Sequence, residues 1–397
     1  METTPAFAGV RCVDCASTFD GVTATHRCPS CGGILNPHYD LEEVSLTRAG
    51  IDARDQAGLW RYEELLPFPE SAGISLAEGQ TPLVDCPTLA ESLGVERVLI
   101  KDEGRNPTGT FKDRGQALAV TAAREHDATD IALATAGNAG QAGAAYAARA
   151  GLDAHVFVPS RAGFTQKAMT NVHGADMTVV EGRIGDAVAA YEDAIADNPS
   201  WYSTQTFVTP YRHEGKKTML YEIVEQLGWT VPDAIVYPTG GGVGLVGMHK
   251  GATEFQSLGL IDDRPPLYAA QSEGCAPIVD AVEAGRGRHE PWATPDTICG
   301  GIEIPDPGAS PLILDAIRES GGGAVATSDE AILDAAVQAA RHTGLELGGA
   351  AGAALSGASA LAARGDLGQD DTVVVLATGA GNKDADVLRS HLMAQGE

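Results

Sequence analysis

Lys112 stands where the chain could lower the pKa of an amine. The segment 98–103 (VLIKDE) alternates as a short strand does, and 106–110 (NPTGT) has the residues of a tight turn. A helical pattern starts at Phe111, with Thr110 as the expected N-cap. Because a helix N-terminus carries partial positive charge, an amine in its first turn loses a proton more readily, and a neutral amine can form a Schiff base with an aldehyde. The alternative is a solvated lysine on a surface helix.

A glycine-rich turn offers a place for an anion. The apolar segment 234–238 (AIVYP) reads as a strand, and TGGGVG at 239–244 leads into a helical pattern. Glycines let backbone N–H groups point at one anion, and the helix N-terminus adds to the field. The turn lacks the GK[ST] ending of an ATP-binding loop, so the phosphate of another ligand is expected there. The residues expected to hold it are Gly240, Gly241, Gly242, Val243 and Gly244.

Four cysteines have the spacing of a zinc ribbon. Two C-x2-C pairs are separated by a short polar stretch and can supply four thiolates to one tetrahedral zinc ion: Cys12, Cys15, Cys28 and Cys31. His26 lies nearby, but the four cysteines already fill the site. Basic residues do not gather around the pairs, so we expect a structural zinc site rather than a nucleic-acid reader. Three isolated cysteines bring the total to seven, and this odd number without an export signal favours a reducing cytoplasm.

The bulk composition narrows the class of partner. The 397 residues carry 54 acidic and 27 basic side chains, a formal net charge of −27, which disfavours nucleic acid as a partner. No apolar run is long enough to predict a membrane span. So acidic a surface is typical of proteins from cells that accumulate salt, where screening makes self-repulsion tolerable, although an ordinary acidic protein is the alternative.

From residue 98 onward, strands and helices alternate, which predicts an α/β fold with parallel sheets covered on both faces. The strand candidates are 98–101, 131–134, 154–158, 176–180, 234–238, 267–271 and 372–376. The helix candidates are 112–126, 139–150, 164–172, 184–196, 213–227, 243–256, 275–284, 328–342 and 350–363. Ligands of such sheets bind at the carboxyl ends of the strands, where all the turns discussed here fall.

Two further polar residues lie in such turns. Asn138 stands between a strand and an alanine-rich helix, and from the local pattern alone it is best interpreted as an N-cap. Thr378 follows the buried strand 372–376, where a turn residue is the ordinary interpretation.

The sequence GTFKDRG after KDEGRNPTG resembles the lysine loop of the fold-type II pyridoxal-phosphate enzymes, the tryptophan synthase beta-like fold, and within it most closely that of the threonine synthases. The resemblance extends from the cysteine pairs to GAGNKD near the C-terminus. It implies that Lys112 binds pyridoxal phosphate, that Asn138 bonds its phenolic oxygen, that the glycine turn holds its phosphate and that Thr378 bonds its ring nitrogen. It also implies a substrate-carboxylate site at Thr135, Ala136 and Gly137.

The chain departs from the family pattern in several places. Residues 201–228 resemble the segment NSxNPYRxEGQKT, and Arg212 is retained as a phosphate ligand candidate, with a surface ion pair as the alternative. The Asn-Ser pair of that segment aligns with Thr206 and Phe207, which puts phosphate recognition in doubt. Most threonine synthases have Asn at the position of Gly241, and the GGG form is closer to the threonine and serine dehydratases.

The resemblance implies conversion of O-phospho-L-homoserine and water to L-threonine and phosphate. The alternatives are a threonine or serine dehydratase, another replacement enzyme such as cysteate synthase, or a zinc-ribbon binding protein on a silent scaffold. The implied architecture is two doubly wound parallel-sheet domains with a zinc ribbon at 1–40, a large domain formed by 41–97 and 215–397, and a small mobile domain at 98–214. Family members are commonly homodimers that act on a small amino acid.

Overall fold

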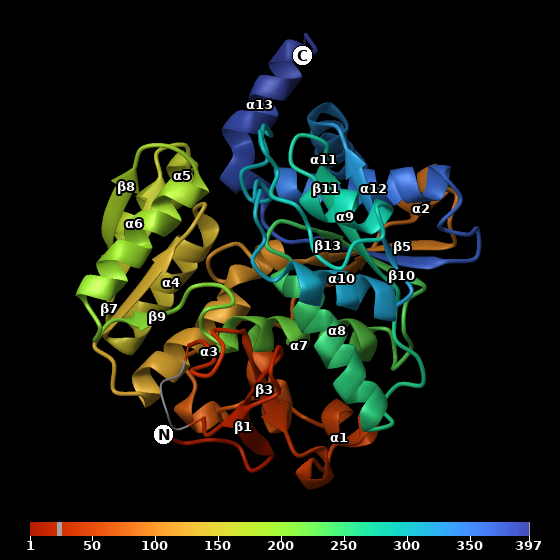
Figure 1. The fold of residues 1–397 in the computed structure, drawn as a ribbon. Helices are drawn as coiled ribbons and strands as arrows, with labels where there is room; N and C mark the ends of the chain where they lie inside the picture. The colour runs from red at the N-terminus through yellow and green to blue at the C-terminus, as the bar shows by residue number, and fades with distance from the viewer. Residues whose placement is uncertain (22–25, 397) are drawn as a thin grey trace.

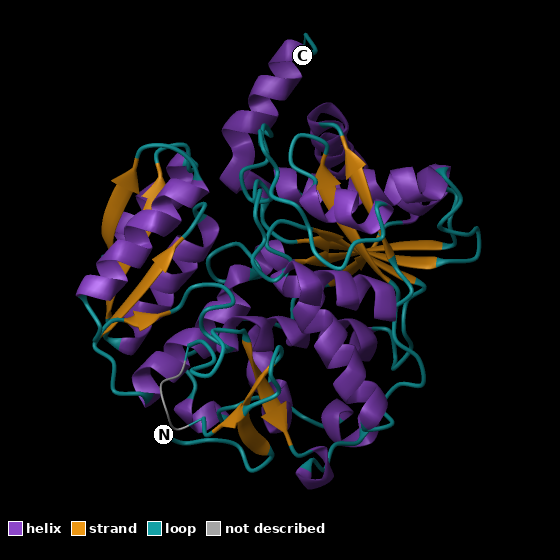
Figure 2. Cartoon of the chain, in the orientation of Figure 1, coloured by secondary structure: helices purple, strands orange, loops and turns teal. Residues whose placement is uncertain are grey.

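The computed structural model describes residues 1–21 and 26–396, which form three sheets (Figure 1). A four-stranded sheet forms one lobe and a six-stranded sheet the other, and a small three-stranded sheet lies at the N-terminal end (Figure 2). The strands of both larger sheets alternate with helices along the chain, as the sequence predicts. No helix in the described ranges is long and apolar enough to cross a membrane.

The six-stranded sheet is parallel except at one edge, where β4 runs antiparallel to β5. Its strands, in spatial order, are β12 (Gly323–Thr327), β11 (Leu267–Ser272), β10 (Ala234–Pro238), β13 (Thr372–Ala377), β5 (Arg97–Asp102) and β4 (Leu83–Asp85). Alternate side chains belong to different cores: Ile235 and Val374 face one, Val236 and Val375 the other. This alternation shows that both faces are buried, as expected for a sheet lined by crossover helices.

The four-stranded sheet is parallel throughout. Its strands, in order, are β8 (Asp176–Val180), β7 (Asp153–Pro159), β6 (Asp130–Ala134) and β9 (Tyr202–Ser203). Ile131 and Leu133 face one core, whereas Ala132 and Ala134 face another, so this sheet is also covered on both sides.

The N-terminal sheet has the order β2 (Thr18–Phe19), β1 (Phe7–Cys12) and β3 (Leu35–Tyr39), all antiparallel. It packs on helices α7 (Tyr211–Gln226) and α8 (Val243–Ser257), because Ile34 and Tyr39 belong to the same apolar core as Tyr221 and Phe255 of these helices. Lys250 Nζ reinforces the contact by donating to Pro37 O at 2.5 Å.

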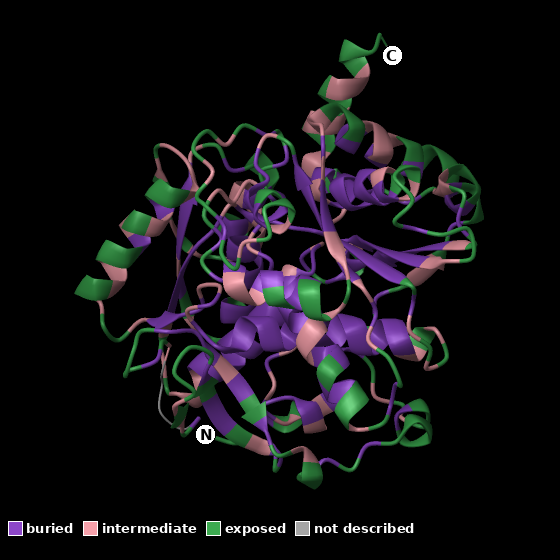
Figure 3. Ribbon diagram, turned by 45° about the vertical axis from the view of Figure 1, so that its right-hand side comes forward, coloured by how far each residue is buried: buried purple, intermediate pink, exposed green. Residues whose placement is uncertain are grey.

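Helices fill the spaces around and between the sheets. They are α1 (Arg48–Asp52), α2 (Pro87–Leu93), α3 (Lys112–Glu125), α4 (Asn138–Ala150), α5 (Phe164–Val172), α6 (Ile184–Asp197), α7 (Tyr211–Gln226), α8 (Val243–Ser257), α9 (Pro277–Glu283), α10 (Ser310–Glu319), α11 (Asp329–Thr343), α12 (Gly349–Ala363) and α13 (Ala385–Ala394). The central helices α3 and α7 are buried over most of their length (Figure 3). They cross closely at Gly215, where any side chain would overlap the carbonyl group of Arg114.

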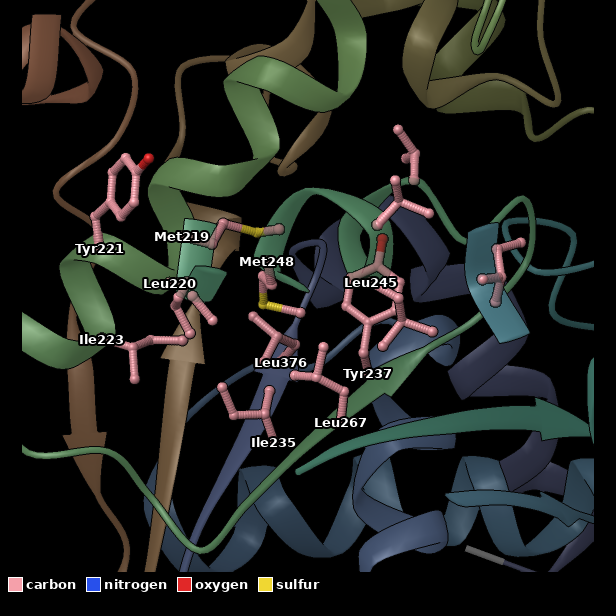
Figure 4. Close-up of a cluster of buried hydrophobic side chains, with 14 of the residues drawn as sticks. Met219, Leu220, Tyr221, Ile223, Ile235, Tyr237, Leu245, Met248, Leu267 and Leu376 are labelled. Carbon is pink, nitrogen blue, oxygen red and sulfur yellow. The ribbon is translucent and has the colours of Figure 1, made fainter. Parts of the chain in front are cut away.

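A large apolar cluster lies where α7 and α8 meet the six-stranded sheet (Figure 4). Met219 and Leu220 of α7 and Met248 of α8 lie over Ile235 and Leu376 of the sheet. Tyr221 also stacks on Phe255, with ring centroids 4.1 Å apart. This cluster fixes α7 and α8 on the sheet and so fixes the polar residues at their N-terminal ends.

All seven strands and nine helices expected from the sequence are present, although helix 213–227 begins earlier, at Tyr211. Strands β9 and β12 and four further helices were not expected. One strand also lies elsewhere than expected: β5 falls in the range 98–214 assigned to the small domain, yet it pairs with β13 and β4 in the six-stranded sheet.

Candidate active site

Lys112 is the first residue of α3, and its turn is bonded to the end of β13. Phe111 N donates to Thr378 O at 3.0 Å, and Thr110 and Gly379 form an isolated antiparallel bridge. The N-cap is Phe111 rather than the expected Thr110, whose Oγ1 instead accepts from Lys112 N at 3.3 Å. These bonds bring two of the expected site residues, Lys112 and Thr378, together.

Lys112 is partly buried, so the interpretation as a solvated surface lysine is wrong. Burial lowers the pKa of its amine to about 7, and the nearby guanidinium of Arg212 lowers it further in the same direction. Lys112 Nζ lies 4.4 Å from the centroid of the Phe111 ring. A substantial fraction of this amine is therefore neutral near pH 7, as a nucleophile requires.

The turn before Lys112 is closed by a buried carboxyl group. Asp113 accepts from Thr108 N at 2.8 Å and from Thr108 Oγ1 at 2.7 Å. Burial raises the pKa of Asp113 to about 7, against the effect of these hydrogen bonds. The loop thus holds the lysine backbone without placing a firm negative charge beside its amine.

The glycine turn joins β10 to α8 at the same end of the six-stranded sheet. Gly242 has φ +67°, and a side chain there would overlap Ile313, so both conformation and space require glycine. At Gly241 a Cβ atom would meet no other atom within 4 Å. Tyr237, in the strand before the turn, contacts Phe111 edge-on, with ring centroids 5.9 Å apart. Open space, glycine backbone and the N-terminus of α8 together suit a bound anion.

Asn138 is the first residue of α4, and the N-cap is Gly137, so the N-cap interpretation of Asn138 is wrong. The side chain is instead left with a buried Oδ1 atom that has no hydrogen-bond partner within the protein. Within this loop Thr135 Oγ1 accepts from Gly137 N at 2.9 Å and from Gly140 N at 3.2 Å. An unpaired buried amide oxygen next to an ordered loop points to a donor that the protein alone does not supply.

A hydrogen bond that the sequence did not predict ties α4, which begins at Asn138, to the turn after β13 of the large sheet. Lys383, which follows the turn at Thr378, donates through Nζ to Gln141 Oε1 of α4 at 2.6 Å. Burial lowers the pKa of Lys383 to about 8. The two residues are 242 positions apart, so only the folded chain reveals the pair.

Arg212 lies in the first turn of α7 and is buried, which excludes the surface ion pair considered from the sequence. Its Nη1 atom donates to Thr204 O at 2.7 Å, whereas Nε and Nη2 have no partner. Lys216 is one helical turn further on and was also missed by sequence analysis. The sequence could have indicated Lys216 as a site residue, because residues four positions apart in a helix lie on the same face and Lys216 is four positions after Arg212.

The four cysteine sulfur atoms form one cluster in which all lie within 4.8 Å of one another. Cys12 Sγ is 3.5 Å from Cys31 Sγ, and Cys15 Sγ is 3.6 Å from Cys28 Sγ. Tetrahedral zinc with Zn–S bonds of about 2.3 Å places its ligands about 3.8 Å apart, so the cluster has room for one ion. His26 is engaged elsewhere, since its Nε2 accepts from Ser203 N at 3.2 Å.

Comparison with known proteins identifies relatives over nearly the whole chain. The family model described as pyridoxal-phosphate dependent enzyme matches residues 74–379. Threonine synthase of Methanosarcina acetivorans is 35% identical and covers 93% of this chain and 91% of its own, and that of Methanocaldococcus jannaschii is 36% identical and covers 95% and 93%.

Solved structures agree in fold. Maize serine racemase superposes with a TM-score of 0.67 at 18% identity and covers 80% of this chain and 94% of its own. A fungal L-serine ammonia-lyase from Rhizomucor miehei gives 0.67 at 23% identity and covers 79% and 97%. At these identities the likeness shows the fold alone.

Proposed function

We infer that this chain, which belongs to the pyridoxal-phosphate dependent enzyme family, is a threonine synthase: a lyase that converts O-phospho-L-homoserine and water to L-threonine and phosphate by γ-elimination and β-addition. The archaeal relatives of that name cover more than nine-tenths of the chain. The observation that carries the assignment is an amine of lowered pKa, Lys112, beside a buried guanidinium with free donors, Arg212. An amine for the cofactor and a cation for the substrate phosphate are what this reaction needs.

The residues present fit pyridoxal phosphate. Lys112 would hold its aldehyde carbon, the turn Gly240–Gly244 its phosphate, and Asn138 its phenolic oxygen, by donation from the Nδ2 group. Thr378 would face the ring nitrogen with a hydroxyl group rather than a carboxylate, which moderates the electron demand of the ring. When bound, the cofactor withdraws electrons from the substrate, so that bonds at Cα, Cβ and Cγ can break.

Lys112 is the residue that moves protons in this proposal. Its Nζ accepts the proton from Cα of the substrate and serves again at Cβ, and a pKa of about 7 suits both acceptance and return near neutral pH. Arg212 holds the phosphate that leaves from Cγ. The loop of Thr135, Ala136 and Gly137 orients the substrate carboxylate, and the Ala136 N–H is the donor proposed for it, because the Gly137 N–H already donates to Thr135 Oγ1.

Product analysis tests the assignment. Purified protein in concentrated KCl is given O-phospho-L-homoserine, and phosphate and threonine are quantified in the same tube. Equal amounts of the two products are expected. If the protein binds the cofactor but releases no phosphate, threonine synthase is excluded; ammonia release from threonine or serine would then identify a dehydratase, which the GGG turn favours, and a replacement enzyme such as cysteate synthase would remain.

We also propose that the cysteine cluster binds one structural zinc ion. The ribbon lies against α7 and α8 through Tyr39 and Asn36, and Lys250 Nζ donates to Asn36 Oδ1 at 3.1 Å. Metal binding should therefore stabilise the fold, without touching the residues assigned to chemistry.

Replacing Cys31 with Ser is expected to remove the zinc and to lower the melting temperature by several degrees while turnover persists at room temperature. Metal analysis and thermal unfolding measure both effects. The control is Cys86→Ser, a buried cysteine outside the cluster that should keep one zinc ion per chain. Absence of zinc from the wild-type protein, purified without chelator, would refute the proposal.

The architecture and setting proposed for the enzyme follow the family. The lobe built on the four-stranded sheet closes over the substrate, and two chains form a homodimer in the cytoplasm of a salt-accumulating cell. A net charge of −27 supports the last point, because self-repulsion falls as salt screens it. Sedimentation at low and high KCl tests the dimer, and turnover that does not rise with KCl would contradict adaptation to salt.

A further inference from the structure

We propose that Lys216 is a second ligand for the substrate phosphate and acts together with Arg212 and Thr204. The inference rests on the proposed function, because it names the residues that bind the phosphate group of O-phospho-L-homoserine. It assigns to the substrate an anion site separate from the glycine turn that would hold the cofactor phosphate.

Lys216 and Arg212 lie side by side on α7. A Cβ atom on Gly115 of α3 would overlap Lys216 Nζ and lie 3.2 Å from Arg212 Nε, so both nitrogen atoms border the same small space. Lys216 Nζ is also 5.0 Å from the centroid of the Phe111 ring, on which Lys112 Nζ lies at 4.4 Å. The unpaired nitrogen atoms of Lys216 and Arg212 therefore lie close to the amine assigned to chemistry.

Most of the donors in this part of the structure have no acceptor. Lys216 Nζ, Arg212 Nε and Nη2, and Thr204 Oγ1 are all buried without a hydrogen-bond partner. Thr204 is held here because its carbonyl oxygen accepts from Arg212 Nη1 at 2.7 Å. Buried donors are almost always satisfied, so the unpaired nitrogen atoms of Lys216 and Arg212 that border one space indicate an anion that the substrate brings.

Other buried lysines show that this chain ordinarily pairs them. Four lysines are buried in the described part of the chain, and three of them donate to oxygen atoms: Lys101 to Glu222, Lys217 to Glu254 and Lys383 to Gln141. Lys216 has no such partner and is completely inaccessible. A buried amine left unpaired in the core is costly unless it has a ligand.

A phosphate group fits these donors better than a carboxylate does. It has three terminal oxygens and nearly two negative charges, which match a guanidinium, an ammonium and a hydroxyl. The family pattern supplies an Asn-Ser pair where this chain has Thr206 and Phe207, and Gln where it has Lys216. Phe207 is buried against the His213 ring, 5.7 Å between centroids, and offers no donor. Lys216 thus replaces polar contacts that this chain has lost.

Charge on Lys216 should depend on the anion. Burial lowers the pKa of its amine far below the ordinary value, and Arg212, Lys112 and Arg114 lower it further, against Glu103 alone. A bound anion favours the protonated form of this amine and so opposes the lowering of its pKa. The protein should therefore take up a proton at Lys216 when it binds an anion, and its affinity for the anion should fall as the pH rises.

The test uses the cofactor-loaded enzyme, with inorganic sulfate as the probe because sulfate does not titrate near neutral pH. Lys216→Gln is expected to raise KM for O-phospho-L-homoserine and the inhibition constant of sulfate by about 10- to 100-fold, with cofactor absorbance unchanged. Lys216→Arg should recover part of both constants. Arg389→Gln, which removes one positive charge from an exposed position on α13, is the control and should change neither.

Calorimetry in two buffers of different ionisation enthalpy supplies a readout that needs no variant. Wild-type protein should take up protons on binding sulfate, and Lys216→Gln should not. Unchanged sulfate inhibition in Lys216→Gln, or sulfate binding of equal affinity by both proteins in calorimetry, would overturn the proposal. Sulfate binding that depends on Lys216 in a protein that does not turn over O-phospho-L-homoserine would support the anion site and refute the proposed reaction.

Discussion

Replacing Lys112 with Ala is expected to lower turnover by roughly 10³-fold or more, because the variant lacks both the amine that holds the cofactor and the base that moves protons. The absorbance of the bound cofactor should disappear in the same protein. Both are measured on the purified variant after reconstitution. Lys167→Ala is the matched control, because Lys167 lies on α5 and donates only to the backbone oxygen of Ser160. A variant that kept its turnover would refute the role of Lys112, whereas a wild-type protein with neither cofactor absorbance nor turnover would revive the alternative of a binding protein.

The pH dependence of cofactor capture gives a second measurement on Lys112. Only the neutral amine attacks an aldehyde, and burial together with Arg212 lowers its pKa to about 7. The capture rate, followed by absorbance after mixing with the cofactor-free protein, should therefore rise as the pH increases through about 7 and level off above it. A midpoint near the ordinary lysine value of 10.5 would show that the amine is not perturbed as the structure indicates.

The local parts of this site could be predicted from the sequence. The tight turn before Lys112 and the glycines at 240–242 are signals contained in a few consecutive residues, and the structure places both turns at the ends of strands in one sheet. Capping was less predictable. Thr110 and Asn138 are good cap residues by type, but Phe111 and Gly137 occupy the cap positions instead.

Contacts between distant parts of the chain could not be predicted in this way. Strand β5 pairs with β13, whose residues are 275 positions further along the chain, so the order of elements gave no sign that β5 belongs to the large sheet. Whether the donors of Arg212 and Lys216 are paired also depends on distant parts of the chain, because α3 and the segment after β9 pack around them and leave some of them without an acceptor. A sequence shows that a lysine is present, and only packing shows that it is unpaired.

The strongest destabilisation is expected from Glu222→Ala. Glu222 lies on α7 and joins three other segments: it accepts from Arg114 of α3 at 2.5 Å, from Lys101 of β5 at 2.7 Å and from Gln80 N at 2.7 Å. Its removal leaves two buried cations without part of their compensation. Such a loss costs about 3–5 kcal/mol in the free energy of unfolding, measurable by denaturant titration. Glu192→Ala, at an exposed position of α6, should cost less than about 0.5 kcal/mol.

Acid unfolding separates the charge of Glu222 from its size. Burial alone would raise the pKa of Glu222, but Arg114 and Lys101 hold it at about 2, against 4.5 in an unperturbed chain. Because the folded pKa is the lower one, the unfolded chain binds the extra proton, and the stabilisation is complete above about pH 4.5 and is lost as the pH falls toward 2. Glu222→Gln keeps the shape without the charge, so its stability should fall less steeply over that interval. Equal slopes would mean that shape and hydrogen bonding, rather than the ion pairs, hold α3, α7 and β5 together.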